Sequence, residues 1–391
     1  MTFVDAIRAD PERARGADFL GVFVPGLNTI DYSTLAPDAR VTSTFVTPAL
    51  SKSFAAGRVK FLPRAYSGFA RSLAANPVDI AVLRLSPPDP DGRMSFGINQ
   101  DYAPIAAAGA RRIVAFVDHA MPHVRGERGL REEDCDAIVE IEEQLVPVPT
   151  ATPGGALARV GAAAATLIRD GDTIQIGIGK VQSAVLANLF DRRDLGLHSG
   201  MIDDSIAALA EKGVLTNALK SADRGLSVTG MAIGGTPAWE YSQHGSVLYR
   251  AADYTHSASV IARQDNFVAI NSAIEVDLFG QCNAELLNGR QISGAGGFHD
   301  FQRGAAGAKG GRSIVALPAT AGGASRIVAR LGAPAIATGP RNDADYIVTE
   351  YGIAALRDLD LDARAESLIM LAAPEFRGAL ADNWREMRAA I

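Results

Sequence analysis

The chain has 391 residues, which is too long for one compact domain and suits two. Apolar residues make up 48% of it and charged residues 21%, so the composition provides for two cores and excludes a largely disordered chain. A net charge of −6 and a pI near 5.6 exclude a general nucleic-acid binder, which needs a basic face.

Two further features bear on the compartment. The opening stretch MTFVDAIRADPERARG lacks the apolar core of a secretion signal, and no run of 18 apolar residues follows, so we expect no membrane association. The two cysteines, Cys135 and Cys282, cannot build a disulfide framework. These features predict a soluble protein of the cytoplasm.

Apolar β-rich runs alternate with Ala-rich helical patterns along the chain, which predicts an α/β fold with mainly parallel sheets. The expected strands are Phe19–Val24, Asp79–Leu85, Arg112–Val117, Thr173–Ile178, Phe267–Asn271, Ser313–Leu317 and Tyr346–Thr349. The expected helices are Pro104–Ala110, Ala156–Arg169, Val181–Phe190, Ser205–Lys212 and Asp362–Ala373.

A Pro- and Gly-rich stretch, VPVPTATPGG, separates two α/β-patterned segments and predicts domains at 1–150 and 151–391. The two segments resemble each other faintly. In each segment, an apolar strand is followed by Asp-x-x-Gly. Asp89 and Gly92 correspond to Asp277 and Gly280, which lie 188 residues further along the chain. This repeat indicates a duplicated α/β domain, although short apolar strands also look alike by chance.

Two glycine loops are candidate ligand sites. The first, Gly177-Ile178-Gly179, joins an expected strand to a helix, where backbone N–H groups can face an anion or a developing oxyanion. It matches neither a full dinucleotide fingerprint nor a P-loop, so a plain tight turn is the alternative. The second is ISGAGGFHDF, in which Gly294, Gly296 and Gly297 precede an imidazole at His299.

Several classes of site lack their motifs. The sequence contains no HExxH, no pair of CxxC motifs and no carboxylate cluster with ligand spacing, so we expect no metal. GxSxG is also missing, which argues against an α/β-hydrolase.

From about Asp79 onward the sequence resembles the acetyl-CoA hydrolase/transferase family, which includes 4-hydroxybutyrate and succinyl-CoA:acetate CoA-transferases. The resemblance is carried by ordered blocks: SPPDPDGRMSFGINQDY, IQIGIGKVQSAVLANLFDRRDLGLHSGM, EKGVLTNALK, INSAIEVDLFGQCNAE, GRQISGAGG, SRIVARLGAP and RNDADYIVTEYGIAALR. It implies two tandem CoA-transferase-type domains, an acyl-CoA substrate bound between them, and a homodimer. In such enzymes a glutamate attacks the thioester and carries the acyl group and CoA through covalent intermediates.

The stretch LGLHSGM departs from that pattern at one decisive position. The family pattern at this place resembles HSEM or HTEM, and the glutamate in it is the covalent nucleophile. This chain reads HSGM, with Gly200 at the position of that glutamate. Glycine has no side chain, so a glutamyl intermediate cannot form at this position.

Three smaller departures accompany it. The N-terminus begins near the family's first helix and lacks the opening strand and its glycine turn. This chain reads GGFHDF where the family usually reads GGQVDF, so His299 is an additional imidazole. Cys282 occupies a position where the family commonly has an aliphatic residue. The loss of a carboxylate and the gain of an imidazole and a thiol predict altered chemistry, whereas drift in a decayed copy is the alternative.

The remaining groups suggest roles. Backbone N–H groups of Gly177 to Gly179 and Gly294 to Gly297 are expected to bind the thioester oxygen, and Lys180 a CoA phosphate. A general base must then activate water or an acceptor. A free imidazole titrates near pH 6.5, so His299 is the first choice and Glu275 the second. Cys282 would accept an acyl group only as a thiolate within reach of His299.

We therefore expect an enzyme that hydrolyses a small acyl-CoA or transfers its acyl group directly to a small acceptor. Two alternatives stay open, a CoA-transferase that uses another carboxylate and a pseudoenzyme that binds a CoA thioester. A dinucleotide-dependent oxidoreductase is disfavoured because GIGKVQ has Gln182 in place of the third glycine.

Overall fold

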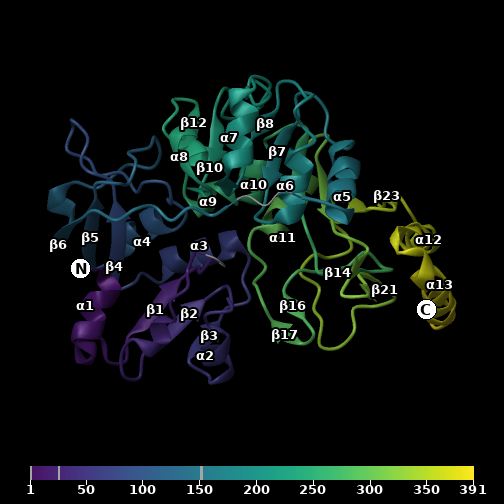
Figure 1. Ribbon diagram of the computed structural model, residues 1–391, viewed down its shortest axis with the longest axis horizontal. Coiled ribbons are helices and arrows are strands. Elements are labelled where there is room, and N and C mark those ends of the chain that lie inside the picture. The colour runs from purple at the N-terminus through teal and green to yellow at the C-terminus, as the bar shows by residue number, and fades with distance from the viewer. Residues whose placement is uncertain (1, 25–26, 150–152) are drawn as a thin grey trace.

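The computed structural model describes residues 2–24, 27–149 and 153–391. Within them, residues before 150 form two parallel three-stranded sheets, in the orders β1-β2-β3 and β4-β5-β6 (Figure 1). The elements of this half are α1 (Phe3–Ala9), η1 (Pro11–Ala14), β1 (Asp18–Gly21), η2 (Tyr32–Thr34), β2 (Arg40–Ser43), α2 (Ser51–Ala55), β3 (Val59–Phe61), α3 (Tyr66–Ala75), β4 (Ile80–Leu85), α4 (Ala103–Gly109), β5 (Arg112–Asp118), η3 (Glu132–Asp134) and β6 (Ala137–Ile141).

The second half is built on a six-stranded sheet in the order β23-β22-β18-β13-β7-β8, parallel except for the β22–β23 pair. Its elements up to the sheet centre are α5 (Ala156–Ala165), β7 (Thr173–Ile176), α6 (Lys180–Leu186), β8 (Gly196–Leu197), β9 (Met201–Ile202), α7 (Asp204–Glu211), β10 (Ser227–Thr229), β11 (Met231–Ala232), α8 (Thr236–Ser242), β12 (Val247–Tyr249), α9 (Ala252–Thr255), α10 (Ala258–Ile261) and β13 (Phe267–Asn271).

The remaining elements lead to α12 and α13, at the opposite end of the molecule from β6 (Figure 1). They are β14 (Glu275–Asp277), β15 (Cys282–Asn283), β16 (Leu286–Leu287), β17 (Arg290–Gln291), α11 (Phe298–Gly307), β18 (Arg312–Ala316), β19 (Thr320–Ala321), β20 (Ala324–Ser325), β21 (Ile327–Val328), β22 (Tyr346–Thr349), β23 (Gly352–Ala355), α12 (Leu361–Leu371) and α13 (Pro374–Ala389).

The predicted α/β class with mainly parallel sheets is confirmed, and each expected strand and helix overlaps an observed one. The boundaries differ locally. The strand expected over Thr173–Ile178 ends at Ile176, because the chain turns at Gly177. The prediction of a loop over Ile292–Phe301 was wrong for its last four residues. These residues, from Phe298 onward, begin α11 directly after the glycines.

The centre of the large sheet is buried on both faces, as parallel sheets covered by helices require. All residues of β7, β13 and β18 are buried, with Ile174, Val268 and Ile314 fully inaccessible. Ile98, Met121 and other apolar residues from the first half belong to the same core cluster. The two halves therefore share part of their core.

One turn of the internal repeat has the same hydrogen bonds in both halves. Oδ1 of Asp89 accepts hydrogen bonds from the backbone N–H groups two and four residues further on, at 2.9 and 2.8 Å. Oδ1 of Asp277 accepts the equivalent pair at 3.1 and 2.9 Å. Gly92 and Gly280 then take φ values of +75° and +88°, which favour glycine. The same hydrogen-bonded turn thus occurs in each half, 188 residues apart.

The two turns differ in burial, which leads to a testable difference. The side chain of Asp277 is fully buried and also accepts a 2.8 Å bond from Nε2 of Gln281, whereas that of Asp89 is 26% exposed. Asp277→Ala should lower the free energy of unfolding by about 3 kcal/mol and Asp89→Ala by about 1 kcal/mol, because only the first leaves buried donors unpaired. Urea denaturation measures both, and equal losses would contradict this account.

Candidate functional site

The candidate site is centred on Gly200, at the carboxyl end of β8. The Gly200 carbonyl accepts hydrogen bonds from the backbone N–H groups of Gly230 and Met231, each at 3.1 Å, so its backbone is fixed to the start of β11. Gly200 itself is partly exposed, between buried Ser199 and buried Met201. A small molecule can therefore approach the position from solvent.

The first glycine loop lies next to Gly200. The Ser199 hydroxyl donates to the carbonyl of Ile176 at 3.0 Å, and Ile176 is the last residue of β7 before Gly177. Gly179 has a φ of +143°, a conformation that L side chains rarely adopt. Ile178 and Lys180 are exposed at the start of α6. The loop thus presents open backbone beside Ser199.

The side chain of His256 lies between Gly200 and the second glycine loop. A Cβ atom on Gly200 would lie 2.6 Å from Cε1 of His256, and one on Gly297 would lie 2.6 Å from Cδ2 of the same ring. Both contacts are too short for any side chain. The imidazole therefore fills the space between the two glycines, including the space that a side chain at residue 200 would need.

Close approach to the first half also fixes this loop. A Cβ on Gly294 would lie 1.8 Å from the carbonyl oxygen of Thr44, and the Gly296 carbonyl accepts from the N–H of Tyr66 at 3.0 Å. The carboxylate of Asp300 accepts from the Ser67 N–H and hydroxyl at 2.9 and 2.7 Å. Residues 294–300 thus dock on residues 44–67 of the first half.

His256 is buried among aromatic rings, 4.2 Å from Tyr66 and 4.7 Å from Phe301 between ring centroids. The Thr255 hydroxyl donates to the Ala251 carbonyl at 3.3 Å, so we assign the proton of His256 to Nδ1, which lies 2.9 Å from that hydroxyl oxygen. Nε2 then keeps its lone pair on the side of Gly200. Burial lowers the pKa of His256 to about 3, so the ring is neutral near pH 7.

Beyond the imidazole lies a buried carboxyl group. The Tyr66 hydroxyl donates to Oδ2 of Asp101 at 2.8 Å, and within the described residues Oδ1 accepts no hydrogen bond. Burial raises the pKa of Asp101 to about 7, against the opposing effect of that hydrogen bond. Gly230 packs so closely that a Cβ there would lie within van der Waals overlap of Oδ1. Sequence analysis missed Tyr66 and His256, because no local motif marks them, and it did not single out Asp101, although this residue lies in the family block SPPDPDGRMSFGINQDY.

Helical geometry turns His299 away from the residue that packs on His256. His299 is the second residue of α11, and successive helical residues are 100° apart, so it lies on almost the opposite face from Phe301. Phe301 is the residue that packs on His256. This orientation disfavours the predicted role of His299 as the base at Gly200.

The other two predicted side chains occupy the sheet of β14, β15 and β21. Oε1 of the half-buried Glu275 accepts from Nδ2 of Asn283 at 2.9 Å. Cys282 is fully inaccessible, its thiol donates to the Gly280 carbonyl at 3.8 Å, and burial raises its pKa. A buried thiol is held in its protonated form, so the structure argues against Cys282 as a nucleophile.

The described residues contain neither a metal-binding cluster nor a membrane-spanning helix. No group of three or more His, Cys, Asp and Glu side chains is arranged to hold a metal ion in residues 2–24, 27–149 and 153–391. No helix in those ranges has both the length and the apolar character needed to cross a bilayer.

Comparison with known proteins places the chain in a family. The model of the acetyl-CoA hydrolase/transferase N-terminal domain matches residues 12–149, and that of the C-terminal domain matches residues 239–384. The chain belongs to the acetyl-CoA hydrolase/transferase family, as the sequence blocks predicted.

Individual relatives agree with this assignment. The chain is 39% identical to the 4-hydroxybutyrate coenzyme A transferase of Clostridium kluyveri, over 79% of this chain and 73% of that protein. It is 32% identical to the succinyl-CoA:cyclohexane-1-carboxylate CoA transferase of Geobacter metallireducens, over 91% and 83%. The crystal structure of RipA from Yersinia pestis superposes with a TM-score of 0.87 at 32% identity, over 99% of this chain and 100% of that one.

The position of His256 predicts the result of restoring a carboxylate. Gly200→Glu should destabilise the protein by about 1–3 kcal/mol, because the new side chain overlaps the imidazole. Adding His256→Ala should recover much of that loss by emptying the space. Gly245→Glu is the matched control, since a Cβ at Gly245 meets no atom within 4 Å. Thermal and urea denaturation compare the variants, and a stable Gly200→Glu single variant would show that the imidazole moves aside freely.

Proposed function

We propose that the protein acts on a small acyl-CoA thioester, by hydrolysis or by direct acyl transfer to a small acceptor, without a covalent glutamyl intermediate at residue 200. Membership of the acetyl-CoA hydrolase/transferase family supports the substrate class. One observation carries the mechanism: residue 200 has no side chain, and the imidazole of His256 occupies the adjoining space. The position can therefore supply a base but no carboxylate nucleophile.

The glycine loops supply the electrostatic part of the proposal. Backbone N–H groups of Gly177 to Gly179, or those of Gly294, Gly296 and Gly297, would stabilise the negative charge on the thioester oxygen. Both loops flank Gly200, one through Ser199 and the other through His256. Lys180 is exposed at the end of the first loop, where it can meet a CoA phosphate.

His256 is our first candidate for the base. Water or the acceptor attacks the thioester carbonyl and gives its proton to Nε2, the carbon–sulfur bond breaks, and the proton then passes to the departing thiolate of CoA. The negative charge of the transition state favours the imidazolium ion, so a base with a low resting pKa still accepts the proton. His299 and Glu275 remain the rival bases.

The proposal extends to the compartment, the oligomeric state and the domain boundaries of the protein. We place it in the cytoplasm because neither cysteine is in a disulfide, and we expect it to form a homodimer as the family resemblance implies. We divide it into domains at 1–150 and 151–391. The chemistry derived above uses coenzyme A as its acyl carrier and needs no metal.

The proposed function is tested by trapping the intermediate. Incubation with an acyl-CoA, borohydride reduction and peptide mapping should leave every glutamate unmodified, while free CoA accumulates in the presence of water or an acceptor. A modified glutamate would instead favour a CoA-transferase that uses another carboxylate. Binding of acyl-CoA with no turnover of any tested thioester would favour the pseudoenzyme.

The identity of the base is tested by paired variants and by pH. His256→Gln should lower kcat about 10²–10⁴-fold, and His299→Gln should leave it within about twofold. The pKa of His256 is lowered to about 3, so its own protonation adds no loss of rate between pH 8 and 5 and lowers the rate only as the pH approaches 3. An ordinary imidazole base would lose activity as the pH falls through about 6.5. A reversed pair of variant rates would return the role to His299.

A further inference from the structure

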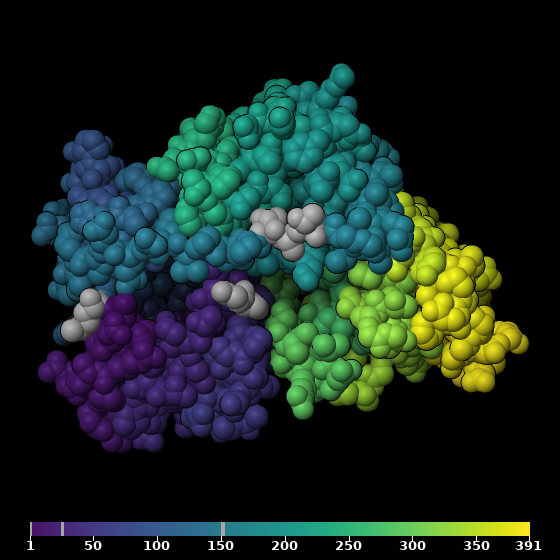
Figure 2. Space-filling view, in the orientation of Figure 1, coloured from purple at the N-terminus to yellow at the C-terminus, as the bar shows by residue number. Residues whose placement is uncertain are grey.

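A cavity of about 430 Å³ lies in the second half, beyond the end of β14, and we refer to it as the arginine cavity. Its lining includes Phe279 and Gln281, which follow β14, and Arg330 and Arg341, which lie between β21 and β22. In Figure 2 the yellow-green part of the second half borders the yellow C-terminal helices. Both arginines belong to sequence blocks that carry the family resemblance, yet the proposed reaction uses neither of them.

The arginine cavity lies toward the opposite edge of the large sheet from the first glycine loop, which follows the carboxyl end of β7. The N–H of Leu356 donates to the carbonyl of Asp345 at 2.7 Å, just before the amino end of β22. Nη2 of Arg364 donates to the Leu356 carbonyl at 2.9 Å, and its Nη1 donates to the carbonyls of Phe279 and Arg341 at 3.3 and 2.8 Å. Substrates of open α/β sheets bind at the carboxyl ends of the strands, so this cavity is separate from that crevice.

Three guanidinium groups meet here without a carboxylate partner. In residues 2–24, 27–149 and 153–391, neither Arg330 nor Arg341 forms a salt bridge or a side-chain hydrogen bond, and both are exposed. Arg364 donates only to carbonyl oxygens. Burial lowers the pKa of Arg364, and so does the charge of Arg341, which shows that these two cations repel each other.

The acidic groups of this region leave most of that charge uncompensated. Asp343 pairs with Arg303 and Asp345 with Arg357, at 3.2 and 2.8 Å. The buried carboxylate of Asp277 accepts N–H donors of its own turn and offsets one of the three positive charges. The arginine cavity therefore keeps an excess of two positive charges.

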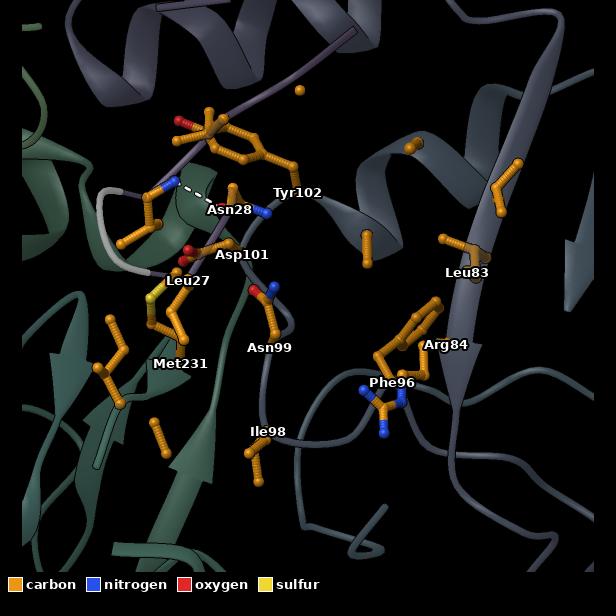
Figure 3. A pocket seen from close by; sticks show the side chains of 18 of the residues that line it. Leu27, Asn28, Leu83, Arg84, Phe96, Ile98, Asn99, Asp101, Tyr102 and Met231 are labelled. Carbon is orange, nitrogen blue, oxygen red and sulfur yellow. Dashed lines mark hydrogen bonds between the residues drawn. The ribbon is translucent and has the colours of Figure 1, made fainter. Parts of the chain in front are cut away.

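An arginine on a cavity wall is not always unpaired in this protein. The larger cavity of the first half, of about 510 Å³, is lined by Arg84 (Figure 3). Arg84 forms a salt bridge with the fully buried Asp118, so its charge is neutralised within the fold. The charges of the arginine cavity lack such partners and are available to a ligand.

The ring of Phe279 positions one of the free cations. Cζ of Arg330 lies 5.6 Å from the ring centroid, within the range of a cation–π contact. The ring is itself held edge-on against Trp384 of α13, with 5.4 Å between centroids. Because Arg330 is partly ordered before a ligand arrives, binding costs less side-chain entropy.

We propose that the arginine cavity binds a small phosphate-bearing molecule, at a site separate from the acyl-CoA site. Guanidinium groups bind phosphoryl oxygens through paired N–H donors, and a diphosphate offers one phosphoryl group to each of Arg330 and Arg341. The negative charge of a diphosphate also matches the excess positive charge. The proposal does not depend on the acyl-CoA function.

Calorimetric titration of the whole chain with sodium pyrophosphate tests the proposal, at an ionic strength of about 0.15 M to screen general surface charge. We expect one saturable site with a Kd below about 1 mM. Coenzyme A carries a diphosphate too, so it is added in a second titration. The Kd for pyrophosphate should then stay within about twofold, because the two ligands occupy different sites.

Arginine variants locate the site. Arg330→Gln and Arg341→Gln should each weaken pyrophosphate binding at least about tenfold, which is about 1.4 kcal/mol. Arg341→Lys should restore only part of the affinity, because lysine keeps the charge but lacks the planar fork of donors. Arg290→Gln is the matched control, since Arg290 is an exposed arginine outside the cavity, and it should leave the Kd within about twofold. The three positions are exposed, so thermal denaturation should give equal Tm values.

Three results would overturn the proposal. The first is the absence of saturable binding at about 1 mM pyrophosphate. The second is an equal loss of affinity in Arg290→Gln, which would reduce the effect to general surface charge. The third is displacement of pyrophosphate by coenzyme A, which would make the cavity part of the acyl-CoA site.

Discussion

The placement of the His256 ring between Gly200 and Gly297 is the contact on which the rest of the site depends. Both glycines approach the imidazole so closely that a side chain at either position would force the ring to shift. The ring therefore excludes a nucleophile at residue 200 and at the same time links the end of β8 to the second glycine loop. Substitution of either glycine would move His256, and with it the cluster of tilted rings that includes Tyr66 and Phe301.

Burial makes this site chemically unusual in two opposite ways. It lowers the pKa of His256, so the imidazole stays neutral, and it raises that of Asp101, which is then partly protonated near neutral pH. Tyr66 joins them, with its ring on the histidine and its hydroxyl on the carboxyl group. The site thus combines a neutral imidazole with a buried carboxyl group whose pKa is about 7.

The duplication explains both the fold and its irregularity. The Asp89 and Asp277 turns keep the same two backbone hydrogen bonds to the aspartate in both halves, although only Asp277 is fully buried. The halves differ in that β13 lies between β7 and β18, whereas among the described residues β4 pairs only with β5. The counterparts of the exposed Ile80 and Val82 are fully buried, so the difference lies in the covering strand and not in the apolar character of the residues beneath it.

The sequence by itself determined the α/β class, the main strands and helices, the two glycine loops, the family and the absence of a side chain at residue 200. These features depend on local periodicity, on turn residues and on ordered blocks, all of which can be read along the chain. The tertiary structure decided which side chains meet. It placed His256, which no motif marks, against Gly200, it began α11 at Phe298 and so turned His299 to the other face, and it buried the thiol of Cys282. Such contacts join residues 56 to 233 positions apart, as in Gly200 with His256 and Ser67 with Asp300, and local pattern carries no information about packing over those separations.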